Sequence, residues 1–184
     1  MKGRSDAAFL FQQLPHANGE AVLMQLHGCY FDRIFKLVLS LVKHRESAEE
    51  LASDVFVQLW QRRDKLSEIR NPEVYLYVTA RNKAFTFLKQ QHNFTDPLDG
   101  IDDFKLELAR SPEDLLISSE MLHRINMAIN ELPTKCKLIF QLVKEQSFKY
   151  REVAEILNLS LKTVEAQMGI AMKKLGKAIA FSTI

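Results

Sequence analysis

The chain has 184 residues, of which 47% are hydrophobic, and its formal net charge is +2 at pH 7. With only 6 glycines and 5 prolines, it has little of the turn chemistry that many short strands need, which favours an all-helical fold of one or two small domains. No apolar run approaches the roughly 20 residues of a membrane-spanning helix, and the N-terminus has no secretory signal pattern. We therefore expect a cytoplasmic protein.

Residues 1–19 are treated as an N-terminal extension, in which Phe9-Leu10-Phe11 begins a short helix that caps the block after it. The first block spans residues 20–92. Its first helix shows the i, i+3, i+4, i+7 spacing of an amphipathic helix, with apolar residues at Phe31, Ile34, Phe35, Val38, Leu41 and Val42.

A second helix is predicted to open at Ser47, with Ser47 and Glu50 forming a capping box. Its expected buried seam is Leu51, Val55, Phe56, Leu59 and Trp60. A different face carries Glu50, Asp54, Gln58 and Gln61, and this face can dock a partner or simply be solvated. Asp54 lies past the first turn, where neither capping nor the helix dipole accounts for a carboxylate, so it is the better docking candidate.

A loop at residues 69–73 leads into a third helix at residues 73–89, because the residue before Pro72 is pushed out of helical angles. We place Val74, Tyr77, Val78, Phe85 and Leu88 on its apolar side and Tyr75, Thr79, Asn82, Lys83 and Thr86 on a narrow polar side. Aromatic, amide and cationic groups together suit single-stranded nucleic acid, although this pattern taken alone favours an ordinary solvated face. Arg81 falls on the apolar side, where it snorkels, pairs with a carboxylate or touches DNA.

Residues 93–118 are predicted to be an acidic linker between two domains. The charge over residues 90–118 is net −5, and this segment contains Pro97, Gly100 and Pro112 without sustained helical periodicity. Such a segment is either a solvated spacer or an internal mimic of nucleic acid that occupies a basic groove. The sequence does not choose between these two explanations.

The second block, residues 119–184, carries a net charge of +4. It begins with a helix at 119–131, a break at Leu132-Pro133 and a helix from Thr134 to about Glu145. A short helix follows and ends at Asn158, and Ser160 then caps another helix. This order is typical of a helix-turn-helix.

The second helix of this pair has a seam of Val164, Met168, Ala171 and Leu175, and small Ala154 on the preceding helix permits a close approach. A helix-turn-helix recognises base edges in the major groove with the leading end of its second helix. Here that end carries Lys162, Thr163, Glu165, Ala166 and Gln167, and the helix continues with a basic surface of Lys173, Lys174 and Lys177.

Neither an enzyme nor a metal protein is expected. The chain has no glycine-rich phosphate loop, no HExxH and no GxSxG, and its five histidines are scattered. Cys29 and Cys136 stand far apart and are interpreted as reduced, packed thiols. We therefore predict no catalytic residue, no metal site, no cofactor and no small-molecule substrate.

Several segments, taken in order, resemble the extracytoplasmic-function (ECF) subfamily of sigma-70 RNA polymerase sigma factors. They are residues 48–60, the stretch 71–76 with Ala80-Arg81-Asn82-Lys83, the segment from Leu132-Pro133 to Phe140, and the helix-turn-helix. The resemblance implies a transcription initiation factor with a region 2-like domain at 20–92 and a region 4-like domain at 119–184. Its partners would be the clamp helices of the largest polymerase subunit and promoter DNA.

By matching positions, the resemblance assigns three groups of residues. The polymerase-binding group is Glu50, Asp54, Gln58, Trp60 and Arg62, although Trp60 is also explained as core. The group for melting and recognising the −10 element is Arg70, Asn71, Tyr75, Asn82 and Lys83. The group for the −35 element is Lys162, Thr163, Glu165, Ala166 and Gln167, with Lys173 and Lys174.

Three positions depart from the family pattern. Lys149 stands where serine usually caps the first helix of the helix-turn-helix, Asn158 stands where glycine is common, and no basic residue follows Val164. The composition also resembles the subgroup that is paired with anti-sigma proteins of the inner membrane, which implies an anti-sigma partner. The alternative is a stand-alone helix-turn-helix regulator that binds an operator as a dimer without polymerase.

Overall fold

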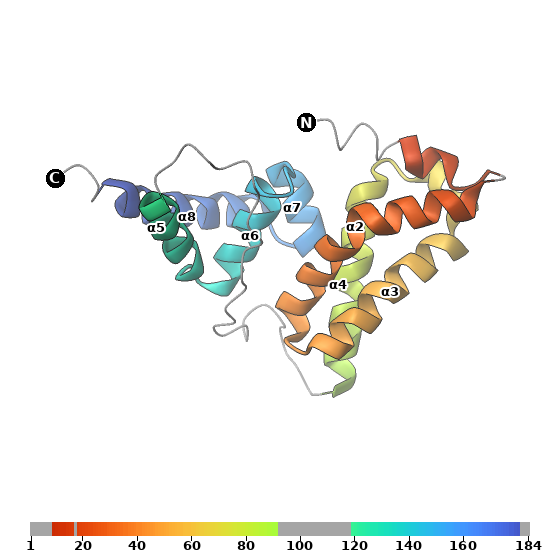
Figure 1. Cartoon of the computed structure of the whole chain (residues 1–184), viewed down its shortest axis with the longest axis horizontal. Helices are drawn as coiled ribbons and strands as arrows, with labels where there is room; N and C mark the ends of the chain where they lie inside the picture. Colours follow the sequence, from red (N-terminus) through yellow and green to blue (C-terminus); the bar gives the residue numbers. More distant parts are fainter. Residues whose placement is uncertain (1–8, 17, 92–118, 181–184) are drawn as a thin grey trace. The chain divides into compact units, whose positions relative to one another are not determined.

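The structure is a computed structural model that describes residues 9–16, 18–91 and 119–180 (Figure 1). Every regular element among these residues is a helix, which confirms the predicted all-helical class. The chain divides into two compact units, made mainly of residues 1–97 and of residues 98–184. The predicted acidic linker at 93–118 lies outside the described residues.

The first unit contains α2 (Gly19–Val42), α3 (Arg45–Gln61), the 3₁₀ helix η1 (Arg63–Glu68) and α4 (Pro72–Gln91). Helix α2 packs against both α3 and α4, and these two also pack against each other (Figure 1). The shared core is apolar and fully buried, with Leu26, Ile34 and Val38 from α2, Ala52, Val55 and Leu59 from α3, and Leu76, Ala80 and Ala84 from α4. Burying the large aliphatic side chains among these contributes roughly 1.5–3 kcal/mol each.

Two helix starts differ from the sequence prediction. Helix α2 begins at Gly19 rather than near Phe31, and it buries Val22, Leu26 and Tyr30 before the predicted stretch. Helix α3 begins at Arg45, because the Nδ1 atom of His44 accepts the N–H of Ser47 at 3.3 Å. The predicted capping box of Ser47 and Glu50 was therefore wrong.

The buried seams agree with the prediction in part. Val55, Phe56 and Leu59 are buried on α3, but Leu51 and Trp60 are half-buried. On α4, Thr79 is buried, so its assignment to the polar side was wrong, whereas Val78, Phe85 and Leu88 are only half-buried. The difference arises because α4 packs against two helices, which widens and rotates its buried face.

A buried carboxylate joins the start of α4 to α2. Glu73 is 8% exposed and lies in the first turn of α4, where the positive end of the helix dipole favours a negative charge. Burial raises the pKa of Tyr30 above its ordinary range, and the nearby Glu73, which accepts a hydrogen bond from the Tyr30 hydroxyl, raises this pKa further. This hydrogen bond links the first turn of α4 to α2.

The second unit contains α5 (Ser119–Asn130), α6 (Thr134–Lys144), α7 (Tyr150–Leu157) and α8 (Leu161–Ala180). Helix α8 packs against both α5 and α6 (Figure 1). The break at Leu132-Pro133 and the end of α6 lie close to the predicted positions.

The two cysteines are in different environments. Cys136 is buried, its Sγ donates to the Gln167 carbonyl oxygen at 3.2 Å, and burial raises the pKa of its thiol. This confirms a packed thiol at Cys136. Cys29 is exposed, so its prediction as a packed thiol was wrong.

No helix among the described residues is long and apolar enough to cross a membrane.

The predicted short helix near the N-terminus is confirmed at residues 9–13. Phe11 and Leu14 are buried, and the Phe11 ring centroid lies 5.8 Å from that of Tyr30 on α2. The segment reaches α2 at Gly19, where an added Cβ would meet the Leu14 carbonyl oxygen too closely and the Cζ3 atom of Trp60 at 3.1 Å. Glycine is therefore required by this close approach.

We expect Gly19→Ala to lower the free energy of unfolding by about 1–3 kcal/mol, because the added methyl group would crowd the Leu14 carbonyl oxygen and the Trp60 ring. Gly28→Ala in the same helix is the control, since a Cβ there meets nothing within 4 Å, and it should stabilise the protein by about 0.5–1 kcal/mol. Urea denaturation followed by circular dichroism measures both. Equal effects of the two substitutions would contradict the packing argument.

Candidate nucleic-acid and partner interfaces

The turn between α7 and α8 has the predicted helix-turn-helix geometry. Asn158 adopts a left-handed conformation with φ 55°, and the Leu159 N–H donates to the Ala154 carbonyl oxygen at 2.9 Å. Ser160 then caps α8, because its Oγ accepts the Thr163 N–H at 3.0 Å. Asparagine adopts the left-handed conformation more readily than most residues, so glycine is not needed at this position of the turn.

The start of α7 compensates for the missing serine at position 149. The Glu152 carboxylate accepts the N–H of Lys149 at 2.7 Å, and the Lys149 carbonyl oxygen accepts the Val153 N–H at 3.0 Å. This is one of the two hydrogen bonds of a capping box, the one in which the side chain of the third helical residue accepts the backbone N–H of the cap residue. Lys149 is thus a workable cap position without a hydroxyl.

Helix α8 buries the seam predicted from its sequence, Val164, Met168, Ala171 and Leu175. The residues on its outward face are exposed, among them Lys162, Glu165, Ala166, Gly169 and Lys173. Thr163 and Gln167 are half-buried, and the backbone carbonyl oxygen of Gln167 accepts a hydrogen bond from the Cys136 thiol. Of the predicted −35 group, the structure therefore places Lys162, Glu165 and Ala166 together on the exposed face.

The two adjacent lysines of α8 differ in their surroundings. The Lys174 ammonium lies 3.5 Å from the Glu131 carboxylate and donates to the Glu131 carbonyl oxygen at the end of α5. A cation at the carbonyl end of a helix is favourable. Lys173 is exposed on the outward face, as is Lys177 one turn later.

Helix α3 presents an exposed acidic face. Glu46, Glu50 and Asp54 are exposed there, and Val57, one turn after Asp54, has 53% of its surface accessible. Protein interfaces commonly combine an apolar contact with polar and charged residues around it. Of the other predicted polymerase contacts, Arg62 is exposed and Gln58 is half-buried.

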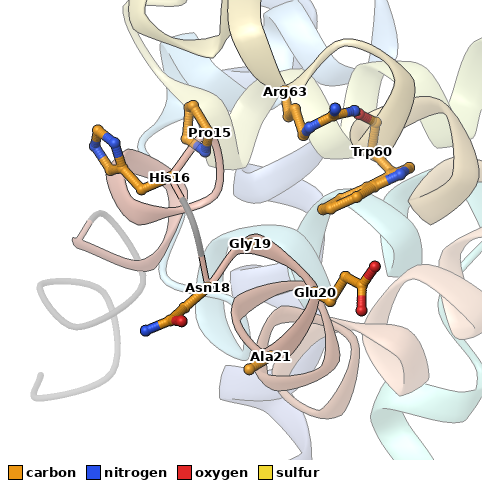
Figure 2. Close-up of a pocket in the computed structure, with 8 residues that line it drawn as sticks. All are labelled: Pro15, His16, Asn18, Gly19, Glu20, Ala21, Trp60 and Arg63. Carbon is orange, nitrogen blue, oxygen red and sulfur yellow. The ribbon is translucent and has the colours of Figure 1, made fainter.

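Trp60, the remaining candidate of this group, lines a pocket of about 480 Å³ between the N-terminal segment and the end of α3 (Figure 2). The Arg63 guanidinium lies 4.3 Å from the centroid of its ring and donates to the Trp60 carbonyl oxygen at 3.0 Å. The ring also lies against Gly19. These contacts give Trp60 a packing role, which is the second of the two explanations offered by the sequence.

The predicted −10 group lies on and before α4, and several of its members already have partners. Asn71 caps α4 by accepting the Val74 N–H at 3.3 Å, and Arg70 is exposed. The Tyr75 hydroxyl is buried without a hydrogen-bond partner among the described residues. Asn82 accepts a hydrogen bond from the Nε of Arg81 at 3.1 Å.

Arg81 is half-buried, and its guanidinium lies 5.7 Å from the Phe85 ring centroid. Burial lowers the pKa of Arg81 from its ordinary value. Its Nη1 has no hydrogen-bond partner in the described part of the chain. A neighbouring aromatic ring and the Asn82 amide, rather than a carboxylate, thus hold this side chain.

The structure also brings together two residues that the sequence assigned to different groups. The Nζ atom of Lys83 on α4 lies 3.1 Å from Oδ2 of Asp54 on α3. The two residues are 29 positions apart, so no periodicity along either helix indicates the contact. Among the described residues, no group of His, Cys, Asp and Glu side chains is arranged to hold a metal ion.

A chain whose described residues include a capped helix-turn-helix with several exposed lysines on its outer face belongs to the class of DNA-binding proteins. Residues 26–94 match the model of sigma-70 region 2, and residues 122–175 match the model of sigma-70 region 4. The chain therefore belongs to the sigma-70 family and is an ECF-type transcription initiation factor, as its sequence predicted. This family is not enzymatic.

Similar proteins agree with this assignment. The chain is 24% identical over 158 residues to the ECF RNA polymerase sigma factor SigW of Bacillus subtilis (strain 168), a match that covers 82% of this chain and 84% of SigW. The sigma factor RpoE in complex with the anti-sigma factor NepR from Bartonella quintana has a similar fold, with a TM-score of 0.57, 17% identity, and coverage of 85% of this chain and 96% of RpoE. CnrH in complex with the cytosolic domain of CnrY gives a TM-score of 0.55 at 18% identity, over 95% of this chain and 97% of CnrH.

Proposed function

We propose that the first unit docks on RNA polymerase core and captures the −10 element, and that the second unit recognises the −35 element. The observation that carries this division is the position of the exposed faces on each unit. An acidic face that ends in an exposed Val57 lies on α3 and suits a cationic protein partner, whereas a face with Lys162, Lys173 and Lys177 lies on α8 and suits phosphates. Polymerase supplies all of the chemistry.

Within this proposal, Asp54 and Glu50 are the principal docking residues, with Gln58 and Arg62 beside them. Arg70 and Lys83 face the opened strand, and Tyr75, whose hydroxyl is buried, contributes only the accessible part of its side chain. Asn71 and Asn82 support the surface through the contacts they already make. On α8, Lys162, Glu165 and Ala166 approach base edges, and Lys173 holds a phosphate. Thr163 and Gln167 lie at the margin of this face, and Lys174 orients α8.

We further propose that residues 93–118 act as an acidic linker between a region 2 domain at 20–92 and a region 4 domain at 119–184. The protein would act in the cytoplasm, where polymerase and promoter DNA are found. An anti-sigma factor is the proposed regulator, since RpoE and CnrH were both solved as complexes and the partner of RpoE is the anti-sigma factor NepR. This anti-sigma factor is proposed to be membrane-bound, because the composition resembles the family subgroup that is paired with anti-sigma proteins of the inner membrane.

Run-off transcription tests the function directly. Purified polymerase core is incubated with upstream fragments from the source genome, with and without the protein, and the 5′ ends of the products are mapped. We expect transcripts that depend on the protein and start at defined positions. Tight binding to duplex DNA without core, together with no dependent transcript, would instead identify a stand-alone regulator.

Asp54→Arg should weaken core binding at least about tenfold, because a like charge placed against a cationic partner costs several kcal/mol. Asp32→Arg is the matched control, since Asp32 is an exposed carboxylate on α2 rather than on the α3 face. Binding is measured by fluorescence anisotropy of labelled protein titrated with core, and circular dichroism verifies the helical content. Equal affinities for the two variants would remove Asp54 from the interface.

Lys173→Ala should weaken binding of the polymerase complex to duplex promoters of any sequence. It should also lower the slope of log affinity against log salt by about one, because one phosphate contact is lost. Lys174→Ala should leave this slope unchanged and alter the free energy of unfolding by at most about 1 kcal/mol, since Lys174 is paired with Glu131 at the surface. A lower slope in the Lys174 variant alone would reverse the two assignments.

A further inference from the structure

We propose that the ion pair between Asp54 and Lys83 couples polymerase docking to capture of the opened DNA strand, by withholding Lys83 from phosphates until a cation of the polymerase engages Asp54. The proposal rests on the proposed function, because it uses Asp54 as a docking residue and Lys83 as a DNA-facing residue. It adds that the DNA contact of Lys83 depends on the polymerase contact of Asp54. Neither of the two roles implies this dependence by itself.

The geometry places the pair at the junction of two surfaces. Asp54 belongs to the exposed acidic face of α3, and Lys83 belongs to α4, which packs directly against α3. Their Nζ and Oδ2 atoms are 3.1 Å apart, and the side chains are 24% exposed for Lys83 and 53% for Asp54. Each partner is therefore accessible to an outside ligand, and each neutralises the other in the free protein.

A phosphate that approaches Lys83 in the free protein meets the Asp54 carboxylate as well. A lysine ammonium has three donors, so the ion pair does not block a phosphate by saturating hydrogen bonds. The carboxylate nevertheless repels the phosphate, because the two anions would lie within the Debye length of about 8 Å at physiological salt. When a polymerase cation binds Asp54, that repulsion is removed and the full charge of Lys83 becomes available.

Thermodynamic linkage requires the effect to be reciprocal. If core binding raises the affinity of this surface for single-stranded DNA, then DNA raises the affinity for core by the same factor. Exposed ion pairs have modest energies, so the factor expected here is about two- to fivefold. Such a factor favours assembly in which docking and strand capture occur together.

The test uses the full-length free protein and a fluorescein-labelled oligothymidylate of about twenty nucleotides, a probe that binds through phosphates and stacking without requiring a promoter sequence. Anisotropy titrations compare wild-type protein with Asp54→Asn, which removes the charge but retains the shape. We expect Asp54→Asn to bind the probe about two- to fivefold more tightly. The increase should disappear when Lys83→Gln is present in the same chain.

Glu50→Gln is the matched control, because Glu50 is an exposed carboxylate one turn earlier on the same helix. It removes the same charge from the protein without removing the partner of Lys83. Asp54→Ala serves as a second variant should the amide disturb α3, since alanine is the best helix former. Circular dichroism verifies that each variant retains its helical content.

Three results would overturn the coupling. The first is an equal increase in affinity for the probe in Asp54→Asn and Glu50→Gln. The second is an increase in Asp54→Asn that persists when Lys83→Gln is present in the same chain. The third is an affinity of Asp54→Asn equal to that of the wild-type protein, including the case in which neither protein binds the probe. Run-off transcription by the wild-type protein separates the two proposals. Normal transcription with any of these three results overturns only the coupling, whereas absence of protein-dependent transcription overturns the proposed function itself.

Discussion

The close packing of α2, α3 and α4 is the constraint on which the rest of the first unit depends. Its inner surfaces use alanine where the helices meet: Ala48, Ala52, Ala80 and Ala84 are all fully buried. Small side chains allow helix axes to approach closely, and close-packed interiors hold their neighbours at fixed separations. The side chains of Asp54 on α3 and Lys83 on α4 consequently lie in contact, although they come from separate stretches of sequence.

Periodicity along the chain predicted the α-helices, apart from the start of α2, and part of their buried seams. The seam of α8 is one case, because Val164, Met168, Ala171 and Leu175 repeat at helical spacing and all four are buried. The turn before it was also predictable, since Asn158 and Ser160 have local conformational and capping preferences that require no knowledge of the remaining chain. These features depend on interactions between residues a few positions apart.

The mistaken details have a different physical origin. His44 rather than Ser47 caps the start of α3, because a ring nitrogen of His44 lies within hydrogen-bond distance of the Ser47 N–H. Thr79 is buried because a second helix covers a side of α4 that is polar on a helical wheel. The contacts from Lys83 to Asp54 and from Lys174 to Glu131 join residues 29 and 43 positions apart, so only the folded chain places them together. The three groups of candidate residues came from family resemblance, and their roles remain proposals.

The different surroundings of Lys173 and Lys174 have a consequence for how this protein can change over time. Successive residues of an α-helix point about 100° apart, so one lysine faces outward while its neighbour reaches the end of α5. Replacement of Lys173 removes the proposed phosphate contact, which targets of every sequence share, and leaves the internal contacts of the unit untouched. Replacement of Lys174 removes a surface contact between α8 and the end of α5 and leaves the proposed DNA contacts in place. Two identical neighbouring residues are therefore subject to different evolutionary constraints, one from DNA affinity and the other from helix packing.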